Sequence, residues 1–203
     1  MAFTFFFRDI HTLDHIAKVF VPAVTGRSRI RVWDAGCAMG PEPYTLAIVL
    51  AEAMGNFSFK NLVITATDID ETDTFGKIIN DAKYKDEETK RIPDEIRKKY
   101  FHEDDEKHGS YRLVESIRDR IQFQKHDLLS LKSIGEGFSL ILCKNVLLHF
   151  QPIERIEVIK MFHQSLAPGG LFATEHTQKM PDELSHMFKQ IVPDAQLFQK
   201  VEA

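Results

Sequence analysis

The hydrophobic and polar positions along the chain follow the two periods that helices and strands impose. Apolar side chains recur at helical spacing from Ile10 to Phe20, and Pro22 and Gly26 are expected to end that helix. Residues 29–34 alternate and are rich in β-forming side chains, which predicts a strand. A glycine-containing turn follows, and Pro41 is a favourable first residue for the next helix.

The next segments repeat this alternation. Residues 62–67 form a nearly continuous apolar run, as expected of a strand that is buried on both faces. Asp68 and Asp70 follow the strand directly, and a helix is predicted over 75–82. Strand, glycine turn, helix, strand, acidic residues and helix, in this order, predict a doubly wound α/β sheet.

The segment 85–124 interrupts the pattern because it is dense in lysine, arginine, aspartate and glutamate. Within it we predict a helix over 93–101 and short strands over 111–114 and 120–124. We interpret it as a small charged α+β insertion, or subdomain, between sheet elements. Residues 1–203 would then form a single domain.

The sheet pattern resumes after the insertion. A buried strand is predicted over 138–143, an amphipathic helix over 152–166, a strand over 171–175 and a last edge strand over 195–201. The expected fold class is therefore α/β, with a Rossmann-like doubly wound sheet.

Composition and charge narrow the classes of protein. Hydrophobic residues make up 43% and charged residues 28%, the balance of a soluble globular protein. The net charge of −4 and the lack of a basic stripe argue against nucleic-acid binding. The N-terminal aromatic run is too short for a signal peptide or a membrane span, so we expect a cytoplasmic protein without membrane insertion. Cys37 and Cys143 lie in apolar contexts and are expected to be buried, reduced thiols.

Two glycines follow the first predicted strand. Gly36 and Gly40 would let a ligand approach the backbone beyond the carboxyl end of that strand. Their G-x-x-x-G spacing is equally compatible with an ordinary turn between a strand and a helix.

Polar residues end the other predicted strands. Asp68 is well placed to accept hydrogen bonds from both ribose hydroxyls of an adenosyl group, whereas an aspartate here can also cap a helix. Asp68 and Asp70 can divide these two tasks, with Asp68 on the ribose. Asp127 can accept from an adenine amino group or serve as a turn acid. Asn145 can contact the reactive end of such a ligand or cap a helix.

Several segments, in chain order, resemble the signatures of the chemotaxis-receptor glutamate methyltransferases, the CheR family. The run over 35–47, A-G-C-A-M-G-P-E-P-Y-T-L-A, resembles A-G-C-s-x-G-x-E-P-Y-S-x-A and is the most specific match. The segments 4–8, 66–70, 127–129 and 138–146 resemble T-x-F-F-R, A-[ST]-D-I-D, [ND]-L-L and F-D-x-I-x-C-R-N-V. The resemblance spans nearly the whole chain. It implies a class I methyltransferase that uses S-adenosyl-L-methionine, releases S-adenosyl-L-homocysteine and methylates a protein glutamate.

The resemblance also implies roles for individual residues. Glu42 would contact the amino end of the cofactor, Asp127 and Leu128 the adenine, and Arg8, together with Thr4, would reach the cofactor and the acceptor carboxylate. The insertion would correspond to the small β-subdomain that docks a receptor tail peptide in some family members. The complete expected cofactor site is Thr4, Ala35, Gly36, Gly40, Glu42, Asp68, Asp127, Leu128 and Asn145.

Two departures from the family pattern fall at the acceptor end. The chain begins at the T-x-F-F-R-like segment, so we expect the helical N-terminal domain of the family to be absent. His149 stands where the family has tyrosine in N-V-x-I-Y-F. A histidine can take a proton from an amine, hydroxyl or thiol acceptor, or it can simply pack under a loop. We expect Arg8 and His149 to be catalytic on a protein or peptide acceptor such as a chemoreceptor. The alternatives are another acceptor, including a small molecule, and a non-catalytic binding module.

His11 and His15 have the i, i+4 spacing of a metal-binding pair. No third ligand is evident near them in the sequence, so no metal site is expected.

Overall fold

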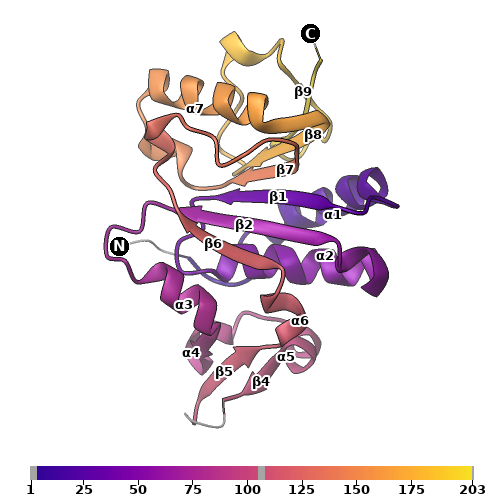
Figure 1. Ribbon diagram of the computed structural model, residues 1–203, viewed down its shortest axis with the longest axis vertical. Coiled ribbons are helices and arrows are strands. Elements are labelled where there is room, and N and C mark those ends of the chain that lie inside the picture. Colours follow the sequence, from indigo (N-terminus) through magenta and orange to yellow (C-terminus); the bar gives the residue numbers. More distant parts are fainter. Residues whose placement is uncertain (1–3, 105–107, 203) are drawn as a thin grey trace.

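The computed structural model describes residues 4–104 and 108–202 and contains a large and a small β-sheet (Figure 1). The large sheet has seven strands in the order β6-β2-β1-β7-β8-β10-β9. The strands from β6 to β8 pair in parallel, and β10 pairs antiparallel with β8 and with β9. Its strands are β1 (Ile30–Ala35), β2 (Leu62–Asp68), β6 (Ile121–Lys125), β7 (Phe138–Cys143), β8 (Leu166–Thr174), β9 (Phe188–Gln190) and β10 (Leu197–Lys200).

The helices cover both faces of the large sheet. Alternate residues of β1 enter different cores, because successive side chains of a strand point to opposite faces. Ile30 and Val32 pack in the core that contains α1 and α2, whereas Trp33 and Ala35 pack in the core that contains α7. The predicted doubly wound α/β fold is thus confirmed. The α-helices are α1 (Ile10–Val24), α2 (Pro41–Phe59), α3 (Phe75–Asp81), α4 (Asp86–Thr89), α5 (Asp94–Tyr100), α6 (Glu115–Arg118) and α7 (Pro152–Ser165).

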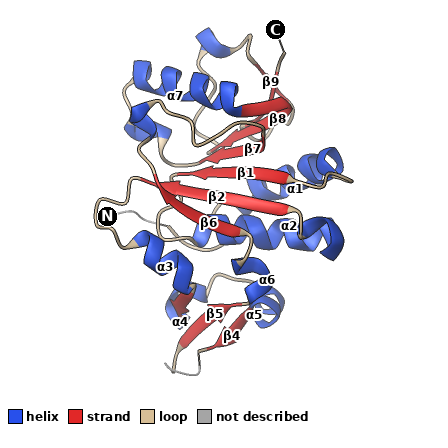
Figure 2. Ribbon diagram, in the orientation of Figure 1, coloured by secondary structure: helices blue, strands red, loops and turns tan. Residues whose placement is uncertain are grey.

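The small sheet lies on the β6 side of the large sheet, beyond α3 and α6 (Figure 2). Its antiparallel strands are β3 (Lys83–Lys85), β4 (Phe101–Glu103) and β5 (Ser110–Leu113), in the order β3-β5-β4. Phe6 fastens the N-terminal segment to it, with edge-to-face ring contacts at 4.8 Å to Tyr84 and 5.4 Å to Phe101. The small sheet therefore helps to hold the segment that precedes α1.

Three sequence-based predictions about elements are wrong. Helix α1 continues through Pro22, because Val24 is buried in the core and Thr25 Oγ1 donates a hydrogen bond to the Val21 carbonyl oxygen. Strand β10 is not an edge strand, since the three-residue β9, too short to show a period, lies outside it. The strand predicted at 120–124 belongs to the large sheet rather than to the insertion, because β6 pairs in parallel with β2.

Both cysteines are buried and unpaired, as predicted. Within the described ranges, none of the helices has the length and apolar character that crossing a membrane requires.

Candidate functional site

A cavity of about 610 Å³ opens at the carboxyl ends of β1, β2 and β7, where parallel strands present their following loops together. It brings together seven of the predicted residues, and the sequence reading missed Ala38, Lys144, Val146 and Leu148 in its wall. The lining residues are Thr4, Arg8, Gly36, Ala38, Glu42, Asp68, Lys144, Asn145, Val146, Leu148 and His149.

A smaller cavity of about 150 Å³ adjoins the first and shares Gly36, Asp68 and Val146 with it. Asp127 and Leu128 line this smaller cavity. Together the two cavities have the volume typical of small-molecule sites. Their shared wall is formed by the loops that follow β1, β2 and β7.

Two residues predicted to contact the cofactor line neither cavity. Ala35 is wholly buried at the end of β1, in the core with α7. Gly40 precedes α2 with a φ of 102°, and a side chain there would lie 2.6 Å from the hydroxyl of Tyr84. That hydroxyl donates a hydrogen bond to the Met39 carbonyl oxygen. The structure thus explains Gly40 by the close approach of Tyr84.

Gly36 is required by the backbone and by its neighbour across the sheet. Its φ is 95°, a conformation that side-chain-bearing residues rarely adopt. Its amide and that of Cys37 donate to the Thr67 carbonyl oxygen, which ties the turn to β2. A Cβ atom at this position would overlap Cγ2 of Val146. The turn after β1 therefore passes close beneath the loop after β7.

We expect Gly36→Ala to lower the free energy of unfolding by about 2–3 kcal/mol, from the strained φ and the overlap with Val146. Urea denaturation measures the loss. Gly26→Ala is the matched control, because Gly26 also has a positive φ of 82° but no atom within 4 Å of the added Cβ. Equal losses in the two variants would contradict the claim that Val146 crowds Gly36.

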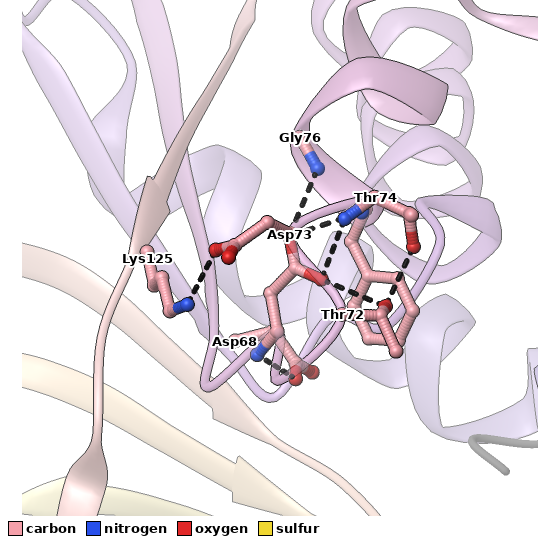
Figure 3. A network of polar contacts seen from close by, with 8 residues as sticks. Asp68, Thr72, Asp73, Thr74, Gly76 and Lys125 are labelled. Atoms are coloured by element: carbon pink, nitrogen blue, oxygen red, sulfur yellow. Dashed lines mark hydrogen bonds and ion pairs between the residues drawn. The ribbon is translucent and has the colours of Figure 1, made fainter.

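Asp68 and Asp70, at the end of β2 and on the loop that follows, have different partners. Figure 3 labels Asp68 together with Thr74 and Gly76 of that loop. Asp70 is buried and accepts hydrogen bonds from the amides of Thr74, Phe75 and Gly76, at 3.0, 3.0 and 3.4 Å. Burial favours a higher pKa for Asp70, but these amide bonds outweigh it and hold the pKa below its usual range. Asp70 therefore satisfies the first turn of α3, which leaves Asp68 to face the cavity.

The Asp68 carboxylate keeps acceptor positions available. Its Oδ2 accepts from the Ala38 amide at 2.9 Å and its Oδ1 from the Asp70 amide at 3.2 Å. A carboxylate offers about four acceptor positions, so about two remain for a ligand. Asp127 is similar, since its Oδ1 accepts from the Leu129 amide at 2.9 Å and so caps a short 3-10 helix, η1 (Leu128–Ser130).

Lys144 is the main residue that the sequence reading missed. Its side chain is fully buried, with Nζ 3.4 Å from Asp9 Oδ2 and 3.6 Å from Glu42 Oε2, and it donates to the Arg8 carbonyl oxygen at 3.4 Å. The available signal was a lysine directly after β7, a strand that the sequence predicts to be buried and the structure buries throughout. Lys144 joins the N-terminal segment to the end of that strand.

Two carboxyl groups beside Lys144 are buried. Burial raises the pKa of Glu42, while the charge of Lys144 opposes that rise. Burial, followed by the proximity of Glu42, raises the pKa of Asp34 well above its usual range. Neither carboxyl oxygen of Asp34 has a hydrogen-bond partner among the described residues. The two buried carboxyl groups of Asp34 and Glu42 therefore lie beside one buried cation, Lys144, whose charge opposes the rise in both pKa values.

The N-terminal segment places Arg8 over the cavity. Phe6 is wholly buried, and the amide of Phe7 donates to Thr45 Oγ1 of α2 at 3.1 Å. These two contacts hold the two residues that directly precede Arg8. The guanidinium of Arg8 lies 5.7 Å from the ring centre of Phe5.

The loop after β7 supplies the remaining wall. Asn145 has a left-handed φ of 59°, and its amide donates to Glu175 Oε2 at 2.8 Å. His149 ends the 3-10 helix η2 (Leu147–His149) and is exposed at the cavity, rather than packed under a loop. The wall of the site therefore carries two acidic side chains, Asp68 and Glu42, and two basic ones, Arg8 and Lys144. That combination suits a ligand that carries both positive groups and a carboxylate.

Comparison with known proteins agrees with this geometry. The family described as "CheR methyltransferase, SAM binding domain" matches residues 2–196. A chemotaxis protein methyltransferase of Listeria innocua is 31% identical over 168 residues, which cover 82% of this chain and 61% of that protein. Chemotaxis protein methyltransferase 2 of Vibrio cholerae is 28% identical, with coverages of 87% and 62%. The chain thus spans less than two thirds of the length of these relatives.

A solved structure supports the fold alone. The crystal structure of DszA carbon methyltransferase superimposes with a TM-score of 0.50 at 13% sequence identity. The match covers 81% of this chain and 35% of that one.

Proposed function

Because the chain belongs to the CheR methyltransferase family, whose S-adenosylmethionine-binding domain matches residues 2–196, we propose that it methylates a glutamate carboxylate of a protein. The names of the relatives support a protein acceptor of the chemoreceptor type. The single observation that carries the proposal is the cavity in which Arg8, Glu42 and Asp68 meet.

We propose that the cofactor extends across both cavities. Asp68 would bind the ribose hydroxyls with its remaining acceptor positions, and Asp127 and Leu128 would hold the adenine in the smaller cavity. Glu42, on the far side of Gly36 in the larger cavity, would bind the ammonium group. The support is the order of these side chains along the cavities and their match to the charge of each part of the cofactor.

The chemistry asks little of the protein beyond positioning. S-adenosylmethionine supplies a methyl group bound to a positively charged sulfonium sulfur. When a carboxylate oxygen bonds to the methyl carbon, the carbon–sulfur bond breaks and the sulfur leaves as a neutral thioether. A glutamate carboxylate is already ionised at neutral pH, so no general base is needed. Arg8 can hold that carboxylate with two parallel hydrogen bonds, and such orientation supplies most of the rate enhancement.

The chain contains a second, small sheet beside the large one. We propose one methyltransferase domain with a subdomain inserted between α3 and β6. The support is that β3, β4 and β5 pair only with one another in a sheet of their own. The predicted range of 85–124 changes at both ends, because β3 already begins at Lys83 and β6 pairs in the large sheet.

The test is methyl transfer from labelled S-adenosylmethionine by the full chain to glutamate-containing receptor-tail peptides. Mass spectrometry should locate a methyl ester on one glutamate, and mild alkali should release the label as methanol. A matched peptide with glutamine at that position is the control. Methylation of the glutamine peptide, or of small metabolites alone, would overturn the protein-carboxylate proposal. Cofactor binding without transfer to any acceptor would indicate a binding module.

A second candidate acceptor is one that must lose a proton, and the exposed His149 at the cavity favours it. Under the leading proposal we expect His149→Phe to keep kcat/KM within about threefold, since a carboxylate needs no base. If His149 acts as a base, the loss should be about 10²–10⁴-fold. Steady-state measurement of kcat/KM for the wild type and for His149→Phe separates the two.

A further inference from the structure

Three side-chain atoms of the types that bind metal ions converge on the surface, outside the proposed methyltransferase cavities. His11 Nε2 lies 3.2 Å from Asp194 Oδ2 and 3.2 Å from His15 Nε2, and His15 Nε2 lies 3.3 Å from the same Asp194 oxygen. The three atoms form a nearly equilateral triangle. None of the three residues lines the proposed cofactor cavities.

The fold supplies the third ligand that the sequence did not reveal. His11 and His15 occupy successive turns on one face of α1, and Asp194 lies in the turn between β9 and β10. The two segments pack in one core, where Leu13 of α1 joins Val192 of the turn. The expectation that these histidines have no third partner is therefore wrong.

Hydrogen bonds within the turn between β9 and β10 fix the backbone around Asp194. The side-chain amide of Gln190 donates to the carbonyl oxygens of Val192 and Ala195, at 3.1 and 3.0 Å. The amide of Ile191 donates to the Leu197 carbonyl oxygen at 3.0 Å. A ligand turn braced in this way loses little conformational entropy on binding.

The tautomer of each imidazole decides what this triangle can hold. A neutral imidazole carries one N–H, so a ring nitrogen is either a donor or an acceptor. His11 Nε2 cannot both donate to Asp194 and accept from His15. With both rings in the tautomer that carries the proton on Nδ1, the two Nε2 lone pairs and the Asp194 oxygen face one point, where a cation can bind all three. We propose that His11, His15 and Asp194 bind a divalent transition-metal ion of the Zn²⁺ type.

The spacing fits such an ion. Zn²⁺ binds histidine nitrogen and carboxylate oxygen at about 2.0–2.1 Å in tetrahedral sites, which places ligand atoms about 3.3–3.4 Å apart. The observed separations of 3.2–3.3 Å lie at that value. Histidine nitrogen with one carboxylate favours Zn²⁺ over Mg²⁺, which prefers oxygen ligands and octahedral geometry.

The surroundings leave the fourth position of the ion open to water. The side chains of His11 and Asp194 are 61% and 57% exposed, so water can complete the tetrahedron. The ion would fasten α1 to the β9–β10 turn. Because Arg8 precedes α1 by two residues, the ion would also steady the segment that lines the cavity.

The test is titration of the full chain with Zn²⁺ alone, in the absence of cofactor, by calorimetry and thermal unfolding. We expect one ion per chain and a rise in Tm of about 5–10 °C at free Zn²⁺ one hundredfold above Kd. Mg²⁺ at the same concentration should give no rise. Co²⁺ bound to the same chain should show the strong visible absorption of a tetrahedral ion.

His11→Gln and Asp194→Asn are the informative variants, since both side chains are exposed and their loss should leave the core intact. Each should weaken Zn²⁺ binding at least about 10–100-fold, the loss that even outer-shell changes cause. His102→Gln, at an exposed position on β4, is the matched control and should bind as the wild type does. Absence of stoichiometric binding, or unchanged affinity in both variants, would overturn the proposal. Methyl transfer is measured separately, so that failure of the metal proposal is distinguishable from failure of the proposed function.

Discussion

Arg8→Ala should lower kcat/KM for methylation of a glutamate peptide about 10²–10³-fold, while the affinity for S-adenosylmethionine changes by only about threefold. The loss follows because the guanidinium orients the acceptor carboxylate, and a misplacement of about 1 Å at a reacting centre can cost about 10²-fold. The hydrogen bond from Lys144 to the Arg8 carbonyl oxygen is a backbone contact and remains in the variant.

Steady-state kinetics with a peptide substrate and calorimetry with the cofactor measure the two parts of this prediction. Arg8→Lys should fall between the wild type and Arg8→Ala, because lysine keeps the charge but cannot form the planar, two-pronged contact. Arg91→Ala is the matched control. Arg91 stacks 4.0 Å from the same Phe5 ring but does not line the cavity, so its loss should leave kcat/KM nearly unchanged. Equal effects at Arg8 and Arg91 would show that Arg8 acts only by packing.

Asp68→Ala should weaken S-adenosylmethionine binding several hundredfold. A hydrogen bond to a charged group contributes about 1.5–3 kcal/mol, and Asp68 is proposed to accept two from the ribose, which amounts to about 3 kcal/mol or more. The variant also frees the amide of Ala38 in the glycine turn, which adds to the loss. At saturating cofactor, kcat should recover much more than kcat/KM for the cofactor does, because Asp68 is remote from the transferred methyl group.

Calorimetry with S-adenosylhomocysteine and S-adenosylmethionine measures this effect, and Tm reports whether the variant stays folded. Asp73→Ala is the matched control, because Asp73 lies on the same loop but forms an exposed ion pair with Lys125 (Figure 3). Exposed ion pairs contribute little, so Asp73→Ala should bind the cofactor nearly as the wild type does. If Asp68→Ala bound the cofactor with wild-type affinity, Asp68 would not contact the cofactor, and its role would be limited to its hydrogen bonds within the loops.

The order of strands and helices could be predicted from the sequence because the spacing of apolar residues in each element reflects which of its faces are buried. The apolar runs at 62–67 and 138–143 predicted strands buried on both faces, and both lie inside the large sheet. The candidate residues Asp68, Asp127 and Asn145 were also found, since the carboxyl ends of parallel strands meet at one edge. Short elements such as β9 escaped because three residues show no period.

Contacts between distant segments were decided only by the tertiary structure. Glycine is required at position 40 because the hydroxyl of Tyr84 leaves no room for a side chain. The glycine spacing in the sequence suggested contact with a ligand instead. Lys144 is a charged residue that the structure buries against Asp9 and Glu42.

The sequence by itself determined the family, the alternating α/β architecture and the acids at the strand ends, because these depend on local periods and contiguous motifs. The tertiary structure alone decided how Lys144 is buried and where β6 pairs. It also brought Asp194 to His11 and His15 across more than 170 residues of chain. Such pairings depend on how separate elements pack in space, and no local pattern encodes them.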